Sequence, residues 1–169
     1  LTLPGTQDQL VQQAAALGKP MVVVIESGGI VNMPWLAQVP AVVMGWYGGQ
    51  QAGLAIANLL FGKVNFSAKL PVSWLREEDL PPFKDSGATT AMDYFLGYRY
   101  ADQFSRTPVF PFGHGLSYST FSYANLQLGC PSAEKEGVIP VSVQVTNSSA
   151  VPGEEVVLAF ARFPSTTAV

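Results

Sequence analysis

Two short, uninterrupted apolar runs occupy residues 21–25 and 41–44, and a helix-like segment accompanies each of them. Apolar runs of this length, rich in β-branched residues, are typical of strands buried on both faces of a parallel sheet. The helix-like segments are residues 6–17, with an apolar stripe, and residues 50–61. Strands that alternate with helices favour an α/β fold, in which helices pack on a mostly parallel sheet.

Local signals predict where both helices begin and end. Thr6 followed by Gln9 has the spacing of a capping box, in which each side chain satisfies a free backbone N–H at the helix start. Gly18 and Gly62 supply the stops. The buried side of the second helix is predicted from its apolar residues, which are Leu54, Ile56, Leu59 and Leu60.

The middle of the chain changes character. Residues 70–74 form a plausible third strand, whereas residues 76–87 hold four acidic residues and two prolines and are predicted to be an exposed loop. Residues 92–118 are dense in aromatics and glycine without a steady period. We expect this stretch to be an extended connector pinned by its rings.

Beyond residue 121 the apolar residues alternate with polar ones. Ile139, Val141, Val143 and Val145 share one face, residues 147–152 form a turn and residues 156–162 form another strand. This pattern predicts the beginning of an antiparallel β-sandwich, with about three of the ~7 strands that such a domain needs. We therefore expect a fragment of a longer protein, divided into an α/β part at 1–75, a connector at 76–120 and a partial sandwich at 121–169.

Composition limits the possible partners. Hydrophobic residues make up 48% of the chain, charged residues make up only 12%, and the net charge is −3. A net negative charge does not attract the phosphate backbone of nucleic acids, so we expect no nucleic-acid partner. The apolar stretches are far shorter than the ~20 residues that cross a bilayer, so we expect no membrane span. The scarcity of charge suggests that other parts of a larger chain cover some of the surface.

Cys130 and His114 are each the only residue of their type, which argues against a disulfide, a cysteine cluster or a multi-histidine metal site. We expect no metal and no cofactor. His114 lies between two glycines, and two interpretations stay open. Its ring holds a tight connector through hydrogen bonds, or it carries a proton, for example in a serine hydrolase. The latter is disfavoured because no Gly-x-Ser-x-Gly elbow lies between a strand and a helix.

The segment at residues 110–121, FPFGHGLSYSTF, closely resembles a motif of family 3 glycoside hydrolases, the β-glucosidase and β-xylosidase group. Further segments resemble motifs of this family in the same order and spacing: LPGTQ at 3–7, SGG at 27–29, MPW at 33–35, WYGGQ at 46–50, NFSAKLP at 65–71 and GYRY at 97–100. GEEVV at 153–157 resembles the start of the fibronectin type III-like domain that often follows, so the resemblance implies a partial domain of this type at 121–169. The chain departs from the family pattern at Gly48 and Phe66, which replace prolines, at Ala68, which replaces a glycine, and at Glu26.

The resemblance implies an exo-acting, retaining β-glycosidase that hydrolyses β-glucosides or β-xylosides without a metal. Such enzymes use two carboxyl groups, a nucleophile and an acid/base, about 5–5.5 Å apart. In this family the nucleophile is an aspartate of an N-terminal barrel, and the acid/base is commonly a glutamate shortly before the Leu-Pro-Gly landmark. Because Leu3 stands near the first residue, we assign no catalytic residue to this chain and expect the barrel of the same parent chain as its partner.

Four residues after the predicted strands are candidates for contact with a saccharide, because ligands of open α/β sheets bind beyond the carboxyl ends of the strands. Trp46 and Tyr47 could face the apolar side of a sugar ring, or could be core rings that lock the loop. Glu26 could bond hydroxyl groups, or could cap a helix or join a salt bridge. Ser27 is a turn residue first and a sugar contact second.

Two Asn-x-Ser triplets, at residues 65–67 and 147–149, fit the glycosylation pattern and are compatible with a secreted, extracellular protein. A different class of function competes with the enzyme: a non-catalytic carbohydrate-binding or scaffold protein that kept the fold. The departures at Gly48, Phe66 and Ala68 favour it, and acidic residues at the two catalytic positions of the parent would count against it.

Overall fold

The computed structural model describes residues 1–82, 94–130 and 137–161. The chain divides into two compact units. The α/β unit consists of Leu1–Lys63 and Leu70–His114, and the strand-pair unit consists of Val64–Lys69 and Gly115–Val169. The division follows spatial contact rather than sequence order. The domain bounds expected at 75 and 120 stay a prediction.

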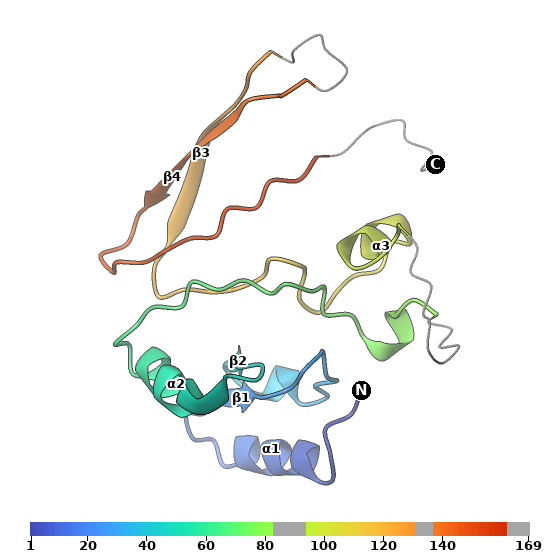
Figure 1. Cartoon of the computed structure of the whole chain (residues 1–169). Helices are drawn as coiled ribbons and strands as arrows, with labels where there is room; N and C mark the ends of the chain where they lie inside the picture. Colours follow the sequence, from blue (N-terminus) through green and yellow to red (C-terminus); the bar gives the residue numbers. More distant parts are fainter. Residues whose placement is uncertain (83–93, 131–136, 162–169) are drawn as a thin grey trace. The chain divides into compact units, whose positions relative to one another are not determined.

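The α/β unit contains a parallel pair of strands with helices around it (Figure 1). In chain order its elements are α1 (Gln7–Ala16), β1 (Val23–Ile25), the 3₁₀ helix η1 (Leu36–Gln38), β2 (Val42–Met44), the 3₁₀ helix η2 (Gly49–Gln51), α2 (Ala52–Leu60), the 3₁₀ helix η3 (Glu77–Asp79) and α3 (Tyr98–Gln103). The register pairs Val23 with Val42 and Ile25 with Met44.

The strand-pair unit contains β3 (Phe121–Leu128) and β4 (Val141–Asn147), which pair antiparallel. The alternation predicted for this region is visible in β4, where Val143 and Val145 are half-buried between exposed neighbours. The register shifts between Ala124 and Gln127. A parallel pair with helices followed by an antiparallel pair confirms the predicted fold class.

The helix stops are confirmed, and the predicted capping box is wrong. Gly18 and Gly62 follow their helices with φ values of 65° and 70°, the left-handed conformation that ends a helix and favours glycine. Thr6 is the N-cap of α1 but makes no side-chain cap hydrogen bond. Its φ of −105° and ψ of 21° lie outside the extended region from which a capping hydroxyl usually reaches the next turn.

Three other predictions are wrong. Residues 70–74 form no strand but a single antiparallel bridge from Trp74 to Phe110, and Pro71 offers no N–H to a ladder. The connector holds a helix, α3, because Tyr100 and Ala101 are buried against Leu75. Residues 156–161 form no strand, and residue 162 lies outside the described residues.

The core of the α/β unit forms around two tryptophans. Trp35 is fully buried, and its indole N–H donates to Asp8 Oδ1 of α1 at 2.7 Å. Trp74 is buried as well, and its indole N–H donates to the Val31 carbonyl at 2.9 Å. Of the predicted buried side of α2, Leu54 and Leu60 are instead exposed. Among the described residues, no helix is long and apolar enough to cross a membrane.

Candidate functional site

The carboxyl ends of β1 and β2 bring two loops to the same edge of the parallel pair. Ile25 is the last residue of β1 and pairs with Met44, the last residue of β2. The Gly45 N–H then donates to the Ile25 carbonyl at 2.8 Å, so the backbones stay together for one residue beyond the strands. All four candidate residues lie in the loops that start here.

Glu26 and Ser27 occupy the first loop. Glu26 is exposed, and its Cγ lies 3.7 Å from the point where a Cβ on Gly45 would stand. Glu26 neither caps a helix nor joins an ion pair in the part of the chain that the structure describes, so neither structural alternative is seen there. Ser27 is half-buried and its Oγ accepts a hydrogen bond of 3.3 Å from the Gly29 N–H, as expected of a turn residue.

Trp46 and Tyr47 occupy the second loop. Trp46 is half-buried and has a φ of 52°, a left-handed backbone that is uncommon for a bulky side chain and that clusters at functional sites. Tyr47 is 79% exposed, and its ring lies against the backbone of Gly28 in the first loop. Tyr47 is therefore not a core ring.

An open hollow of about 200 Å³ is lined by residues of α1 and β1 and by Glu26. Its lining is mostly apolar and comes from Leu3, Gln7, Leu10, Val11, Val23, Val24, Ile25 and Glu26. Among the described residues that line it, the polar side chains are those of Gln7 and Glu26. Sugar sites need several convergent hydrogen-bonding groups, which this hollow lacks. The exposed loop edge, with Trp46, Tyr47 and Glu26, has the better chemistry for a saccharide.

His114 holds the connector in place. Its carbonyl accepts from the Leu70 N–H at 2.8 Å, and its ring stacks on Phe110 with centroids 4.9 Å apart. Across the described residues, no three side chains of His, Cys, Asp or Glu are grouped so as to hold a metal ion.

Asn65 is the centre of a polar network in the strand-pair unit that sequence analysis did not anticipate. Its amide nitrogen donates to Ser119 Oγ at 2.7 Å and to the Pro152 carbonyl at 2.9 Å. Its oxygen accepts from Ser117 Oγ at 3.0 Å and from the Tyr118 N–H at 2.9 Å. In the sequence, Asn65 belonged to an Asn-x-Ser triplet that pointed to glycosylation and to the family-like NFSAKLP segment, and neither signal predicted a network. In the folded chain both donors of this amide are engaged.

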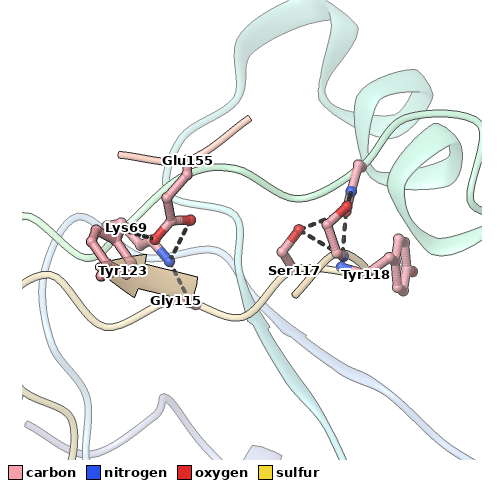
Figure 2. A network of polar contacts seen from close by, with 8 residues as sticks. Lys69, Gly115, Ser117, Tyr118, Tyr123 and Glu155 are labelled. Carbon is pink, nitrogen blue, oxygen red and sulfur yellow. Dashed lines mark hydrogen bonds and ion pairs between the residues drawn. The ribbon is translucent and has the colours of Figure 1, made fainter. Parts of the chain in front are cut away.

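An ion pair joins other residues of the same unit, as Figure 2 shows. Lys69 Nζ donates to the Gly115 carbonyl at 2.8 Å and lies 3.3 Å from Glu155 Oε2. Tyr123 of β3 donates its hydroxyl to Glu155 Oε1 at 2.8 Å. Both charged side chains are mostly covered, with 16% and 13% of their surface exposed. These contacts hold the segments together rather than forming an open site.

Comparison with known proteins decides the family. Residues 1–118 match the model of the glycosyl hydrolase family 3 C-terminal domain.

The chain belongs to glycoside hydrolase family 3.

Curated family 3 relatives match nearly all of the chain. The probable β-glucosidase J of Aspergillus fumigatus is 43% identical over 98% of the chain, and the β-glucosidase BoGH3A of Bacteroides ovatus is 36% identical over 92%. These matches take up 20% and 22% of the relatives, so the chain spans about one fifth of their length.

Solved structures of the family share the fold. The family 3 β-glucosidase of Bifidobacterium adolescentis superposes with a TM-score of 0.78 at 34% identity, covering 89% of this chain and 23% of that one. DesR, a β-glucosidase from Streptomyces venezuelae solved in complex with D-glucose, superposes with a TM-score of 0.74 at 38% identity, covering 88% of this chain and 20% of that one.

Proposed function

We propose that this family 3 chain is part of an exo-acting, retaining β-glycosidase that hydrolyses β-glucosides or β-xylosides. The observation that carries the proposal is the match to relatives named β-glucosidase over 98% and 92% of the chain. Glucose is bound in the DesR structure, which supports a glucoside as the first substrate to test.

In this proposal the chain supplies one wall of the sugar site and the rest of the protein supplies the chemistry. The nucleophile and the acid/base belong to segments upstream, including an N-terminal barrel. Trp46 and Tyr47 offer aromatic surface for the apolar face of a pyranose. Glu26 accepts hydrogen bonds from sugar hydroxyls, and Ser27 keeps the turn that presents it.

We also propose that the protein is secreted. Support comes from the Asn-x-Ser triplet at residues 147–149, where Asn147 is exposed at the end of β4 and its amide nitrogen makes one hydrogen bond, to the Val151 carbonyl at 2.8 Å. The triplet at residues 65–67 lends less support, because Asn65 is half-buried and its amide nitrogen makes two hydrogen bonds. The shift in mass of the secreted protein after removal of N-glycans tests this point.

The test of the activity compares the full-length protein with the 169-residue chain on p-nitrophenyl β-glucoside, β-xyloside and α-glucoside. We expect the full-length protein to cleave a β-glycoside, to spare the α-glucoside and to release a product whose anomeric configuration is retained in proton NMR. We expect no turnover from the 169-residue chain. The α-glucoside is the control for non-specific hydrolysis.

Two results would overturn the proposal in different ways. Turnover by the 169-residue chain would place the reacting carboxylates within it and would direct attention to Glu26. A full-length protein that binds glucose without cleaving any of the three glycosides would support the non-catalytic carbohydrate-binding alternative.

A further inference from the structure

Gly28 and Tyr47 meet across the two loops at the edge of the parallel pair. A Cβ built on Gly28 would lie 2.9 Å from Tyr47 Cε2, 3.5 Å from Cζ and 3.4 Å from the hydroxyl oxygen. Carbon atoms in ordinary contact lie about 3.5–4.0 Å apart. The ring of Tyr47 therefore occupies space that any side chain at position 28 would claim.

Few other contacts hold the Tyr47 ring, so the contact with Gly28 largely determines where the ring lies. The residue is 79% exposed, so little else restrains it. Trp46 directly precedes Tyr47, and its left-handed backbone sets the direction in which the chain reaches Tyr47. The hydrogen bond from the Gly29 N–H to Ser27 Oγ closes the turn that contains Gly28.

We infer that Gly28 is a positioning residue: its bare backbone is the surface on which the Tyr47 ring rests, and this sets the angle at which the ring faces the sugar. The inference rests on the proposed function. The ring surface turned away from Gly28 is the surface available to the apolar face of a pyranose. Gly28 itself makes no contact with the substrate in this arrangement.

The chemistry of the contact makes Gly28→Ala an informative variant. The atoms that the new methyl group meets belong to the far end of an exposed side chain, which is able to swing away. The φ of Gly28 lies outside the left-handed region, so alanine brings no backbone strain. The substitution should therefore move the ring while leaving the fold and its stability nearly unchanged.

Gly29→Ala is the matched control, because it places the same methyl group in the same turn. A Cβ on Gly29 would meet nothing within 4 Å, and its φ also lies outside the left-handed region. Any effect of Gly28→Ala that Gly29→Ala does not share comes from the contact with Tyr47 rather than from a general stiffening of the turn.

The experiment measures kcat and KM of the full-length enzyme on p-nitrophenyl β-glucoside for Gly28→Ala, Gly29→Ala, Tyr47→Ala and the double variant G28A/Y47A. We expect Gly28→Ala and Tyr47→Ala each to raise KM about threefold to tenfold, the size of one lost aromatic contact, with a smaller change in kcat. We expect Gly29→Ala to match the wild type. In the double variant the glycine substitution should add nothing, because the ring on which it acts is gone.

The outcomes separate the inference from the proposed function. If Tyr47→Ala raises KM and Gly28→Ala does not, the positioning role is wrong while Tyr47 keeps its place in the site. If the two effects multiply in the double variant, Gly28 acts by another route and the inference is overturned. If Tyr47→Ala leaves KM unchanged, the proposed wall of the site fails, and this inference fails with it.

Discussion

At position 48 the chain has a glycine where the family pattern has a proline, and the structure gives a local reason. The φ of Gly48 is −76°, which suits proline and any other residue. A Cβ there, however, would lie 2.6 Å from Ala52 Cβ and 3.2 Å from Ala52 Cα at the start of α2. Neither atom is able to swing away, since both are fixed by the helix backbone. The glycine at 48 therefore fits the present position of α2.

The space around the missing Cβ predicts opposite effects on stability for alanine at Gly48 and at Gly53. We expect Gly48→Ala to lower the free energy of unfolding by about 1–3 kcal/mol through overpacking. Gly53, inside α2, has open space around its missing Cβ, so Gly53→Ala should raise stability by about 0.5–1 kcal/mol. Urea denaturation of the two variants beside the wild type measures both. Equal stability of Gly48→Ala and wild type would contradict the prediction.

A second departure from the family pattern, Ala68, brings no backbone strain. An alanine in place of a glycine strains the backbone where the φ is left-handed. The residues other than glycine with positive φ are Trp46, Ser105 and Asn125 in the part of the chain that the structure describes, and Ala68 is not among them. Alanine therefore brings no backbone strain at position 68, so backbone strain there does not support a protein that lost its chemistry.

At the scale of elements, sequence pattern predicted those whose signals are local. The runs at 21–25 and 41–44 became β1 and β2, and the glycine stops stand where they were expected. Patterns that depend on distant partners failed. Residues 70–74 looked like a strand, but their backbone bonds go to residues 109–114 at irregular intervals. The sequence offers no means of knowing which distant segment supplies those partners, nor that Tyr47 rests on Gly28.

The contact between β3 and Glu155 predicts a dependence on pH. The hydrogen bond to the Glu155 carboxylate raises the pKa of Tyr123 above its ordinary value of 10.0. A group with a raised pKa in the folded state stabilises that state below the unfolded pKa, and the contribution is lost as the pH rises through the folded pKa. The strand-pair unit should therefore lose this contribution in alkaline solution above about pH 10.

Absorbance of the tyrosinate ion at 295 nm, followed against pH, tests this contact. We expect Glu155→Ala to move one tyrosine titration to lower pH, and Tyr123→Phe to remove that titration. Glu154→Ala is the control, because the Glu154 carboxylate is next to Glu155 in sequence but does not accept the Tyr123 hydrogen bond. An alkaline titration that Glu155→Ala leaves unchanged would show that Tyr123 ionises independently of Glu155.

At the scale of the whole molecule, the path of the chain gives the Asn65 network its importance. The chain enters the strand-pair unit at Val64, returns to the α/β unit at Leu70 and enters the strand-pair unit again at Gly115. Residues 64–69 thus belong by contact to one unit, while the other unit flanks them in sequence on both sides. The four hydrogen bonds of Asn65 reach the segments at 117–119 and at 152, and hold this insertion in place.

Truncation of this side chain should therefore loosen the strand-pair unit before it affects the α/β unit. We expect Asn65→Ala to cost about 2 kcal/mol or more, because Ser119 is buried and loses a partner while the bonds to the backbone disappear as well. Hydrogen exchange of the full-length protein, followed by mass spectrometry, is the measurement. Protection should fall in peptides from β3 and β4 and persist in those from β1 and α2.

A control variant shows whether a loss of hydrogen-exchange protection comes from the broken Asn65 network. Asn58→Ala makes the same chemical change at a half-buried asparagine of α2, outside the network. It should leave protection of β3 unchanged, because alanine also favours the helix. Asn65→Asp adds a finer test: it keeps the size of the side chain but turns its two donors toward Ser119 and Pro152 into acceptors. If Asn65→Asp and Asn65→Ala both exchanged like the wild type, the insertion would be held by the Lys69–Glu155 pair instead, and Lys69→Met would then produce the loss of protection expected here.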